Sequence, residues 1–271
     1  MAGLLSFAKT IRANLSFQGP TVRIVYLSEI MKHANKDSLD KYIADRAPLF
    51  YRDIDNIHRS MQDGFFLTPI KETLSKLPTS RSFQESHFGE ITTGIFAEEV
   101  MGLRKLYSKL SLLSAENSNA YKMDLVLYNP DSDPLEFVFG EVKSSPKTAL
   151  QGFPAGHDKS CFADIFNSLN HYASSDLEFD LTAAKDHIDS LSIEEKTRVR
   201  NALKPYSNSV VKYAGFAVID STTRHDGEIS LLAKRKNKKD FEVDVICVEA
   251  FPEMAESVYK RLEGLKQNVS N

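Results

Sequence analysis

Two acidic residues and a lysine stand where two adjacent predicted strands meet. Residues 135–140 are apolar enough to form a buried strand, and Glu141-Val142-Lys143 follows directly. Residues two apart in a strand point to the same face, about 7 Å apart, so Glu141 and Lys143 should project together. Val142 should point into the opposite layer. A carboxylate and an ammonium at the end of an apolar strand are costly to desolvate, which indicates a role for the pair.

A second strand is predicted upstream, over residues 122–128. The turn-forming residues 129–134 join the two strands, which predicts an antiparallel pair with Asp124 beside Glu141 and Lys143. Two carboxylates can hold a divalent cation such as Mg²⁺, which polarises a phosphoryl oxygen and activates bound water. The ammonium would position that water and offset charge in the transition state. This chemistry suits phosphodiester hydrolysis. The alternative interpretation is a surface hairpin with an ordinary Glu–Lys pair, because E-x-K triplets are frequent.

These residues resemble a known nuclease signature. Asp124, followed by Glu141-Val142-Lys143 at the end of the next strand, is similar to the PD-(D/E)XK signature of restriction-endonuclease-like nucleases. Met123 stands where that signature usually has a proline. The resemblance implies that Asp124 and Glu141 hold the metal and that Lys143 positions the attacking water.

A narrower resemblance covers about residues 83–250. Phe88-Gly89-Glu90, the strand around Asp124 and residues 140–145 resemble the nuclease subunit family of the Hachiman antiphage system, HamA. This resemblance implies a DNA nuclease that uses Mg²⁺ or Mn²⁺. It also implies antiphage defence as the setting and a HamB-like helicase subunit as the partner.

A helix capped by Ser86 is predicted from about residue 87 to residue 101, followed by a strand over residues 103–113. In the superfamily, the first core helix often supplies a further acidic residue, and Glu90 matches that position. Gly89 beside it would permit close backbone approach. The alternative is that Glu90 lies near the first turn because the helix dipole favours a carboxylate there.

Basic residues after the signature are candidates for contacts with DNA. Residues 146–157 contain Pro and Gly and are predicted to form a loop. Lys147 and Lys159 are the predicted DNA-binding residues, and His157 is a further candidate. The alternative is that each is an exposed, solvated charge. The basic run at 234–239 is likewise either a solvated loop or a phosphate-binding patch.

The amino-acid composition indicates which class of protein the chain belongs to. The 271 residues are 42% hydrophobic and 26% charged, which is typical of a globular protein. The net charge of −3 does not favour nucleic-acid binding by the whole surface, so a local patch or a partner must supply it. Cys161 and Cys247 lack metal-binding spacing and are expected to be reduced core residues. Neither a signal peptide nor a membrane helix is predicted, so we expect a cytoplasmic protein that does not enter a membrane.

The predicted elements favour an α/β fold. Helix, strand, strand, strand, helix and strand follow one another, which is compatible with a mixed central sheet flanked by helices, and the motif implies a restriction-endonuclease-like core. Residues 1–80 are predicted to form an N-terminal α/β region that packs on the core or docks a partner. This region should contain a strand after Gly19-Pro20, a helix beginning near Leu39 and another helix from Leu49 to Ile57.

Residues 81–271 are predicted to form the nuclease core, with a helical insertion at 174–205. A helix with an apolar face from Phe162 to Tyr172 should follow the loop, and further strands are predicted at 213–220 and 241–250. In the last helix, Met254, Val258, Leu262 and Leu265 should share the apolar face.

Three functions remain open from the sequence. The first is a metal-dependent DNA nuclease with Asp124, Glu141, Glu90 and Lys143 as its site. The second is a DNA-binding or adaptor subunit whose site is catalytically degenerate. The absence of the usual proline before Asp124 is compatible with this alternative. The third is a nuclease that acts on RNA, because such a site reads phosphate rather than sugar.

Overall fold

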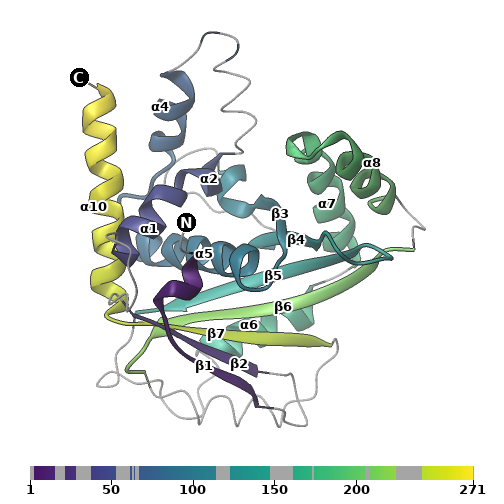
Figure 1. Ribbon diagram of the computed structural model, residues 1–271, viewed down its shortest axis with the longest axis horizontal. Helices are drawn as coiled ribbons and strands as arrows, with labels where there is room; N and C mark the ends of the chain where they lie inside the picture. Colours follow the sequence, from purple (N-terminus) through teal and green to yellow (C-terminus); the bar gives the residue numbers. More distant parts are fainter. Residues whose placement is uncertain are drawn as a thin grey trace.

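A mixed sheet forms the centre of the protein (Figure 1). The computed structural model describes residues 3–15, 22–28, 38–52, 62, 64, 67–113, 123–146, 161–172, 174–204, 208–223 and 240–270. Within these residues the sheet has seven strands in the order β1-β2-β7-β6-β5-β4-β3. The strands are β1 (Ala8–Leu15), β2 (Val22–Leu27), β3 (Arg104–Ser108), β4 (Leu125–Asn129), β5 (Glu136–Ser145), β6 (Val210–Asp220) and β7 (Phe241–Val248).

The strand directions divide the sheet into two parts. β3, β4 and β5 are antiparallel to one another, whereas β5, β6, β7 and β2 run parallel. β1 closes the far side by pairing antiparallel with β2. This arrangement confirms the predicted α/β fold with a mixed central sheet.

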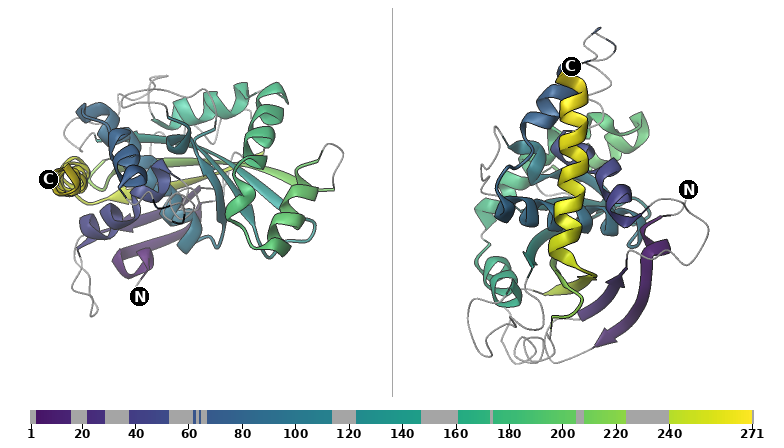
Figure 2. Two further views of the ribbon diagram at one scale, coloured as in Figure 1. Left: turned by 90° about the horizontal axis from the view of Figure 1, so that it is seen from above. Right: turned by 90° about the vertical axis from the view of Figure 1, so that its left-hand side faces the viewer.

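Helices cover both faces of the sheet (Figure 1). On one face α5 lies along β5, while α10 packs against α5 and α1; on the other face α6 contacts β5 and β6. Figure 2 shows α10 standing beside the sheet as a long helix, seen end-on from above. The described α-helices are α1 (Leu39–Arg46), α2 (Pro48–Tyr51), α4 (Thr68–Ser75), α5 (Arg81–Glu99), α6 (Cys161–His171), α7 (Ser174–Lys185), α8 (Ile193–Ala202) and α10 (Phe251–Ser270). The 3₁₀ helices are η1 (Leu4–Phe7), η2 (Lys109–Leu112) and η3 (Ile188–Ser190).

Strand β5 carries apolar side chains to both layers. Phe137 and Phe139 belong to the apolar cluster that includes α6, whereas Val138 and Val142 belong to the cluster that includes α5 and α10. A strand buried on both faces needs a continuous apolar run rather than an alternating one. This explains why residues 135–140 are almost uniformly apolar.

The order α5, β3, β4, β5, α6, β6 matches the predicted succession of helices and strands. It is consistent with a restriction-endonuclease-like core. The predicted hairpin is confirmed, because β4 and β5 are antiparallel and joined by the turn before residue 135. Helices α7 and α8 occupy the segment predicted to be helical at 174–205.

The N-terminal elements are part of the same sheet. β2 confirms the strand predicted after Gly19-Pro20 and pairs in parallel with β7, where Arg23 forms a 2.5 Å ion pair with Asp244. β1 was not predicted from the sequence. α1 confirms the helix predicted near Leu39. The helix predicted from Leu49 to Ile57 does not run on from α2, because Arg52 is extended; residues 53–57 lie outside the described residues.

Three expected boundaries or faces are wrong. α5 begins at Arg81 and not near residue 87, because Ser80 rather than Ser86 accepts a hydrogen bond from a first-turn amide. The strand predicted over 103–113 ends at Ser108, whose side chain accepts the Leu110 N–H and starts η2. Leu265, predicted to lie on the apolar face of the last helix, is 48% exposed.

Two expectations about the chain as a whole can be compared with the described residues. Cys161 and Cys247 are buried and form no disulfide, as predicted. Among the described helices, none has the length and apolar character needed to cross a bilayer.

Candidate active site

The antiparallel pairing of β4 and β5 brings Asp124 next to Glu141. Leu125 pairs with Gly140, so the residue before Leu125 adjoins the residue after Gly140. Both carboxylate residues are buried, with 3% and 8% of their surface exposed. The predicted proximity of Asp124 and Glu141 is therefore confirmed by the strand register.

Both oxygens of Asp124 have a partner. Lys109 places its Nζ 3.0 Å from Oδ1, and the backbone N–H of Val142 donates to Oδ2 over 2.7 Å. The Lys109 backbone N–H also donates to the Asp124 carbonyl over 2.8 Å. These contacts fix Asp124 between η2 and β5.

Residue 123 has a structural reason not to be proline. The Met123 N–H donates to Oδ2 of Asp180 in α7 over 3.4 Å, and the Tyr107 hydroxyl donates to the other oxygen over 2.6 Å. Proline has no backbone N–H and could not make the first bond. The departure from the usual signature thus coincides with a contact that ties α7 to the residue before Asp124.

Glu141 and Lys143 project together, as predicted. Lys143 Nζ lies 2.5 Å from Glu141 Oε1, and the Ser168 hydroxyl of α6 also donates to this carboxylate. Burial, followed by the negative charge of Asp124, raises the pKa of Glu141, while Lys143 opposes the rise. The pKa of Lys143 is raised although burial lowers it, because Glu141 and Asp124 favour the ammonium.

Glu90 approaches the same cluster from α5. It lies in the middle of that helix, so the interpretation of Glu90 as a first-turn residue favoured by the helix dipole is wrong. The residue is 6% exposed, and its Oε2 has no hydrogen-bond partner among the described residues. Burial, and next the charge of Asp124, raise the pKa of Glu90 well above its usual range.

Gly89 explains how α5 comes so close to the sheet. A Cβ added at Gly89 would lie 2.7 Å from the Ser144 Cβ at the end of β5. The Ser144 hydroxyl also donates to the Glu85 carbonyl over 3.1 Å. The predicted close approach at Gly89 is confirmed, and it brings Glu90 toward the end of β5.

A cavity of about 560 Å³ opens beside these residues. It is lined by side chains from α5, η2 and the end of β5, and Glu141 is not among them. The lining residues that bear charge or a titratable ring are Glu85, His87, Glu90, Lys109, Asp124 and Lys143. The cavity is large enough for a phosphate group and places both ammonium groups on its wall.

Lys109 is the site residue that sequence reasoning missed. The sequence showed only that it interrupts the apolar pattern of residues 103–113. A lysine in an apolar segment needs a carboxylate partner if it is buried, and this signal could have found it. Asp124 and Glu90 raise the pKa of Lys109 more than burial lowers it.

A buried hydrogen-bond chain runs from the cavity toward α10. His87 Nδ1 lies 2.9 Å from the Tyr51 hydroxyl of α2, which lies 2.8 Å from the Tyr259 hydroxyl of α10. Burial and the nearby charge of Lys109 lower the pKa of His87 to about 4. A neutral His87 therefore links three helices beside the cavity.

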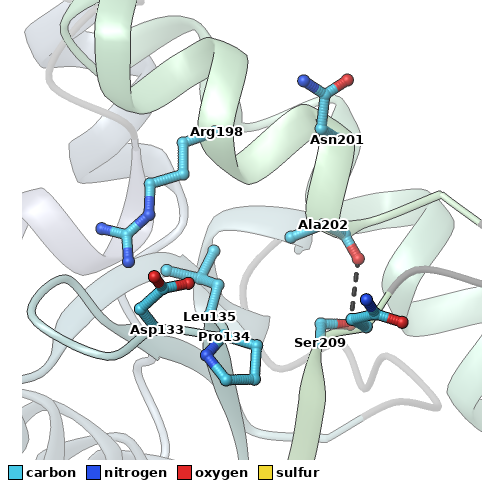
Figure 3. Close-up of a pocket in the computed structure, with 8 residues that line it drawn as sticks. Asp133, Pro134, Leu135, Arg198, Asn201, Ala202 and Ser209 are labelled. Atoms are coloured by element: carbon cyan, nitrogen blue, oxygen red, sulfur yellow. Dashed lines mark hydrogen bonds between the residues drawn. The ribbon is translucent and has the colours of Figure 1, made fainter.

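A second hollow of about 400 Å³ lies near the other end of β5 (Figure 3). Figure 3 shows Arg198 of α8 reaching toward the turn between β4 and β5, and its Nη1 donates to the Pro130 carbonyl over 2.6 Å. Ser209 donates to the Ala202 carbonyl over 3.0 Å. The Arg198 bond holds α8 on the hairpin, and the Ser209 bond ties the end of α8 to the residue before β6.

The remaining predicted DNA contacts lie outside the described residues. They are Lys147, His157, Lys159 and the basic run at 234–239. Their roles stay predictions.

The donor set of the cluster fits a hard divalent cation. Glu90, Asp124 and Glu141 offer only carboxylate oxygens, which Mg²⁺ and Mn²⁺ prefer. Glu90 Oε2 is buried and receives no hydrogen bond from any residue that the structure describes. In the described parts of the chain, no three His, Cys, Asp or Glu side chains converge as a ready coordination shell. Asp124 and Glu141 are each paired with a lysine instead.

Comparison with known proteins gives one result that covers nearly the whole chain. A family model described as HamA matches residues 7–262. A search of curated proteins finds no match.

Proposed function

Because the chain belongs to the HamA family, that of a Hachiman antiphage defence subunit, we propose that it is the nuclease effector of such a system. The proposed activity is metal-dependent hydrolysis of DNA phosphodiester bonds. The observation that supports this activity is that buried Asp124 and Glu141 lie next to each other at the end of the β4–β5 hairpin, where Lys143 forms an ion pair with Glu141. We further propose that the fold is a member of the PD-(D/E)XK superfamily.

Each residue has a stated part in the proposed reaction. Asp124 and Glu141 would hold Mg²⁺ or Mn²⁺, and Glu90 would assist from α5. A metal bound there would supply Lewis-acid polarisation of a phosphoryl oxygen and a water of lowered pKa. Lys143 orients the attacking water and offsets charge in the transition state.

The direct test is cleavage of plasmid DNA by the purified chain with Mg²⁺. Glu141→Gln and Lys143→Met should each lower the rate by roughly 100-fold or more, because a metal ligand or a transition-state contact is lost. The matched controls are Glu136→Gln and Lys212→Met. Glu136 and Lys212 form a 2.6 Å ion pair at the other end of β5 and should be dispensable. Full cleavage by both folded site variants would sink the proposal.

Metal removal gives an independent test of the same mechanism. EDTA should stop cleavage, and Mg²⁺ or Mn²⁺ should restore it. Ca²⁺ should restore little, because its larger and more flexible shell positions water poorly. Undiminished cleavage in EDTA contradicts the mechanism.

The second candidate is a catalytically degenerate DNA-binding or adaptor subunit. It is favoured by the lack of a ready three-residue coordination shell among the described residues. The same assay separates the candidates, since an adaptor would bind DNA without cutting it under any divalent metal. An RNA substrate in a parallel reaction tests the remaining alternative, an RNA-directed nuclease.

We also propose that the chain works with a HamB-like helicase subunit in the cytoplasm. With a net charge of −3, the chain has little electrostatic affinity for DNA. A helicase would supply that affinity and deliver DNA to the cavity.

A further inference from the structure

Lys109 is built into the site. η2 begins at this residue, and the Ser111 hydroxyl donates to the Ser108 carbonyl over 2.7 Å inside that turn. Lys76 Nζ, from the residue that follows α4, donates to the Ser111 carbonyl over 3.0 Å and secures the turn from outside. The backbone and the ammonium of Lys109 both contact Asp124. Such double attachment is not expected of a solvated surface lysine.

The contact occupies an oxygen that the proposed metal needs. Oδ2 of Asp124 already accepts from Val142, and Lys109 holds Oδ1 at 3.0 Å. An ammonium and a divalent cation repel each other strongly when both lie within a few ångströms of one buried carboxylate. Lys109 and a metal ion therefore compete for Asp124.

A phosphate in the cavity would change this balance. The Lys109 side chain is 22% exposed and lines the cavity together with Lys143. A phosphodiester offers the ammonium a second anionic partner. It also adds negative charge beside the carboxylates. The first effect favours release of Asp124 by Lys109, and the second favours a divalent cation in its place when substrate arrives.

Building on the proposed function, we infer that Lys109 couples divalent-metal binding to substrate binding by holding Asp124 until a phosphate enters the cavity. Lys109 is thus a positioning residue that keeps the site's affinity for free metal low. By linkage, the factor by which DNA tightens metal binding equals the factor by which metal tightens DNA binding.

The test measures Mn²⁺ affinity by titration calorimetry on the full chain, with no turnover involved. Lys109→Met and Lys109→Gln should bind Mn²⁺ roughly tenfold or more tightly than wild type, because the competing charge is gone. Lys109→Arg keeps the charge and should stay close to wild type. Lys212→Met, in β6, is the matched control for removing a lysine that is paired with a glutamate away from the cavity. Circular dichroism checks that each variant is folded.

A second arm repeats the titration with a short phosphorothioate duplex that resists cleavage. The duplex should tighten Mn²⁺ binding by wild type at least several-fold and by Lys109→Met much less. Unchanged Mn²⁺ affinity in the neutral variants overturns the inference. The inference is also overturned if the duplex leaves the Mn²⁺ affinity of the wild-type chain unchanged. This outcome can be read even if the neutral variants fail to fold.

These outcomes are distinct from failure of the proposed function. Absence of Mn²⁺ binding by wild type, with and without the duplex, defeats the metal site itself and the inference with it. If Asp124→Asn abolishes Mn²⁺ binding while Lys109→Met leaves the affinity unchanged, the metal site is supported. That result contradicts only the role of Lys109.

Discussion

Individual residues at the site are arranged to keep charge buried but balanced. Glu90, Asp124 and Glu141 face Lys109 and Lys143. Burial is the largest single influence on the pKa of Glu90, Glu141, Lys109 and Lys143. Each lysine pairs with a different carboxylate. Removing one member leaves its partner buried and unpaired, which is costly. Variants at these positions therefore need a stability measurement beside every activity measurement.

Gly89 gives a prediction at the residue scale. Gly89→Ala should destabilise the protein by about 1–3 kcal/mol, because the added methyl overlaps Ser144 and forces α5 away from β5. Denaturant unfolding measures the change.

The control is Gly264→Ala in α10, where an added Cβ meets nothing within 4 Å. That change should leave stability unchanged or raise it by up to about 1 kcal/mol, because alanine favours the helix. If Gly89→Ala proves as stable as Gly264→Ala, α5 does not lie in close contact with β5 at Gly89.

At the scale of elements, α5 connects the site to the rest of the protein. α5 places Glu90 near the carboxylates and packs Gly89 against β5. Its His87 contacts the Tyr51 hydroxyl of α2, which in turn contacts the Tyr259 hydroxyl of α10. The site depends on helices that are distant in sequence. A change in α10 should therefore reach the cavity through Tyr259, Tyr51 and His87.

This hydrogen-bond chain predicts a pH effect on stability. The pKa of His87 is about 4 in the folded protein, against about 6.5 in an unfolded chain. Between these values the unfolded state binds a proton that the folded state does not. Stability should therefore fall as pH drops from about 6.5 to 4, by up to about 3 kcal/mol from this residue.

The measurement is the unfolding free energy from pH 7 to pH 4 for wild type and His87→Gln. The variant should lose less stability over this range, because its side chain takes up no proton. Comparing the two also removes the contribution of Glu90, whose raised pKa acts in the opposite direction. His171→Gln, at an exposed position in α6, should retain the wild-type slope. An identical slope in wild type and His87→Gln would show that His87 titrates normally.

At the scale of the whole molecule, the N-terminal strands complete the sheet that holds the site. β2 pairs along β7, so it protects the edge of a strand whose apolar side chains enter both layers. Large apolar side chains are exposed at Leu67 and Ile70, before and in α4, and at Phe179 and Ile193, in α7 and α8. We therefore propose residues up to about Leu77 and residues 174–205 as the surfaces that dock the partner.

The proposed partner predicts control of activity by ATP. We expect a stable complex in which the nuclease is largely inactive until the helicase translocates on DNA. Cleavage should be compared for this chain alone, for the complex, and for the complex with ATP. An ATP-hydrolysis-dead helicase is the control and should leave the complex inactive. If no complex forms, or if ATP makes no difference to cleavage by the complex, this model of control is wrong.

Local features of the protein can be predicted from the amino-acid sequence. The apolar run before Glu141, the turn residues after the preceding strand and the period of two within strands predicted the hairpin and the adjacency of Asp124 and Glu141. These features depend on neighbours within about twenty residues, where hydrophobic pattern and turn chemistry dominate. The same reasoning predicted α1, α6 and most of the sheet.

The partners of these residues depend on how distant segments pack together. Lys109 reaches Asp124 because Ser108 ends β3 and turns the chain into η2. Met123 reaches Asp180 from α7, and His87 reaches Tyr259 from α10 through Tyr51. The helix start near residue 87 is wrong because Ser80 and Ser86 are both possible N-caps by residue type, and only Ser80 accepts a first-turn N–H in the fold. The contacts of Lys109, Met123 and His87 join segments far apart in the chain, and their energy exists only once the layers have closed around them.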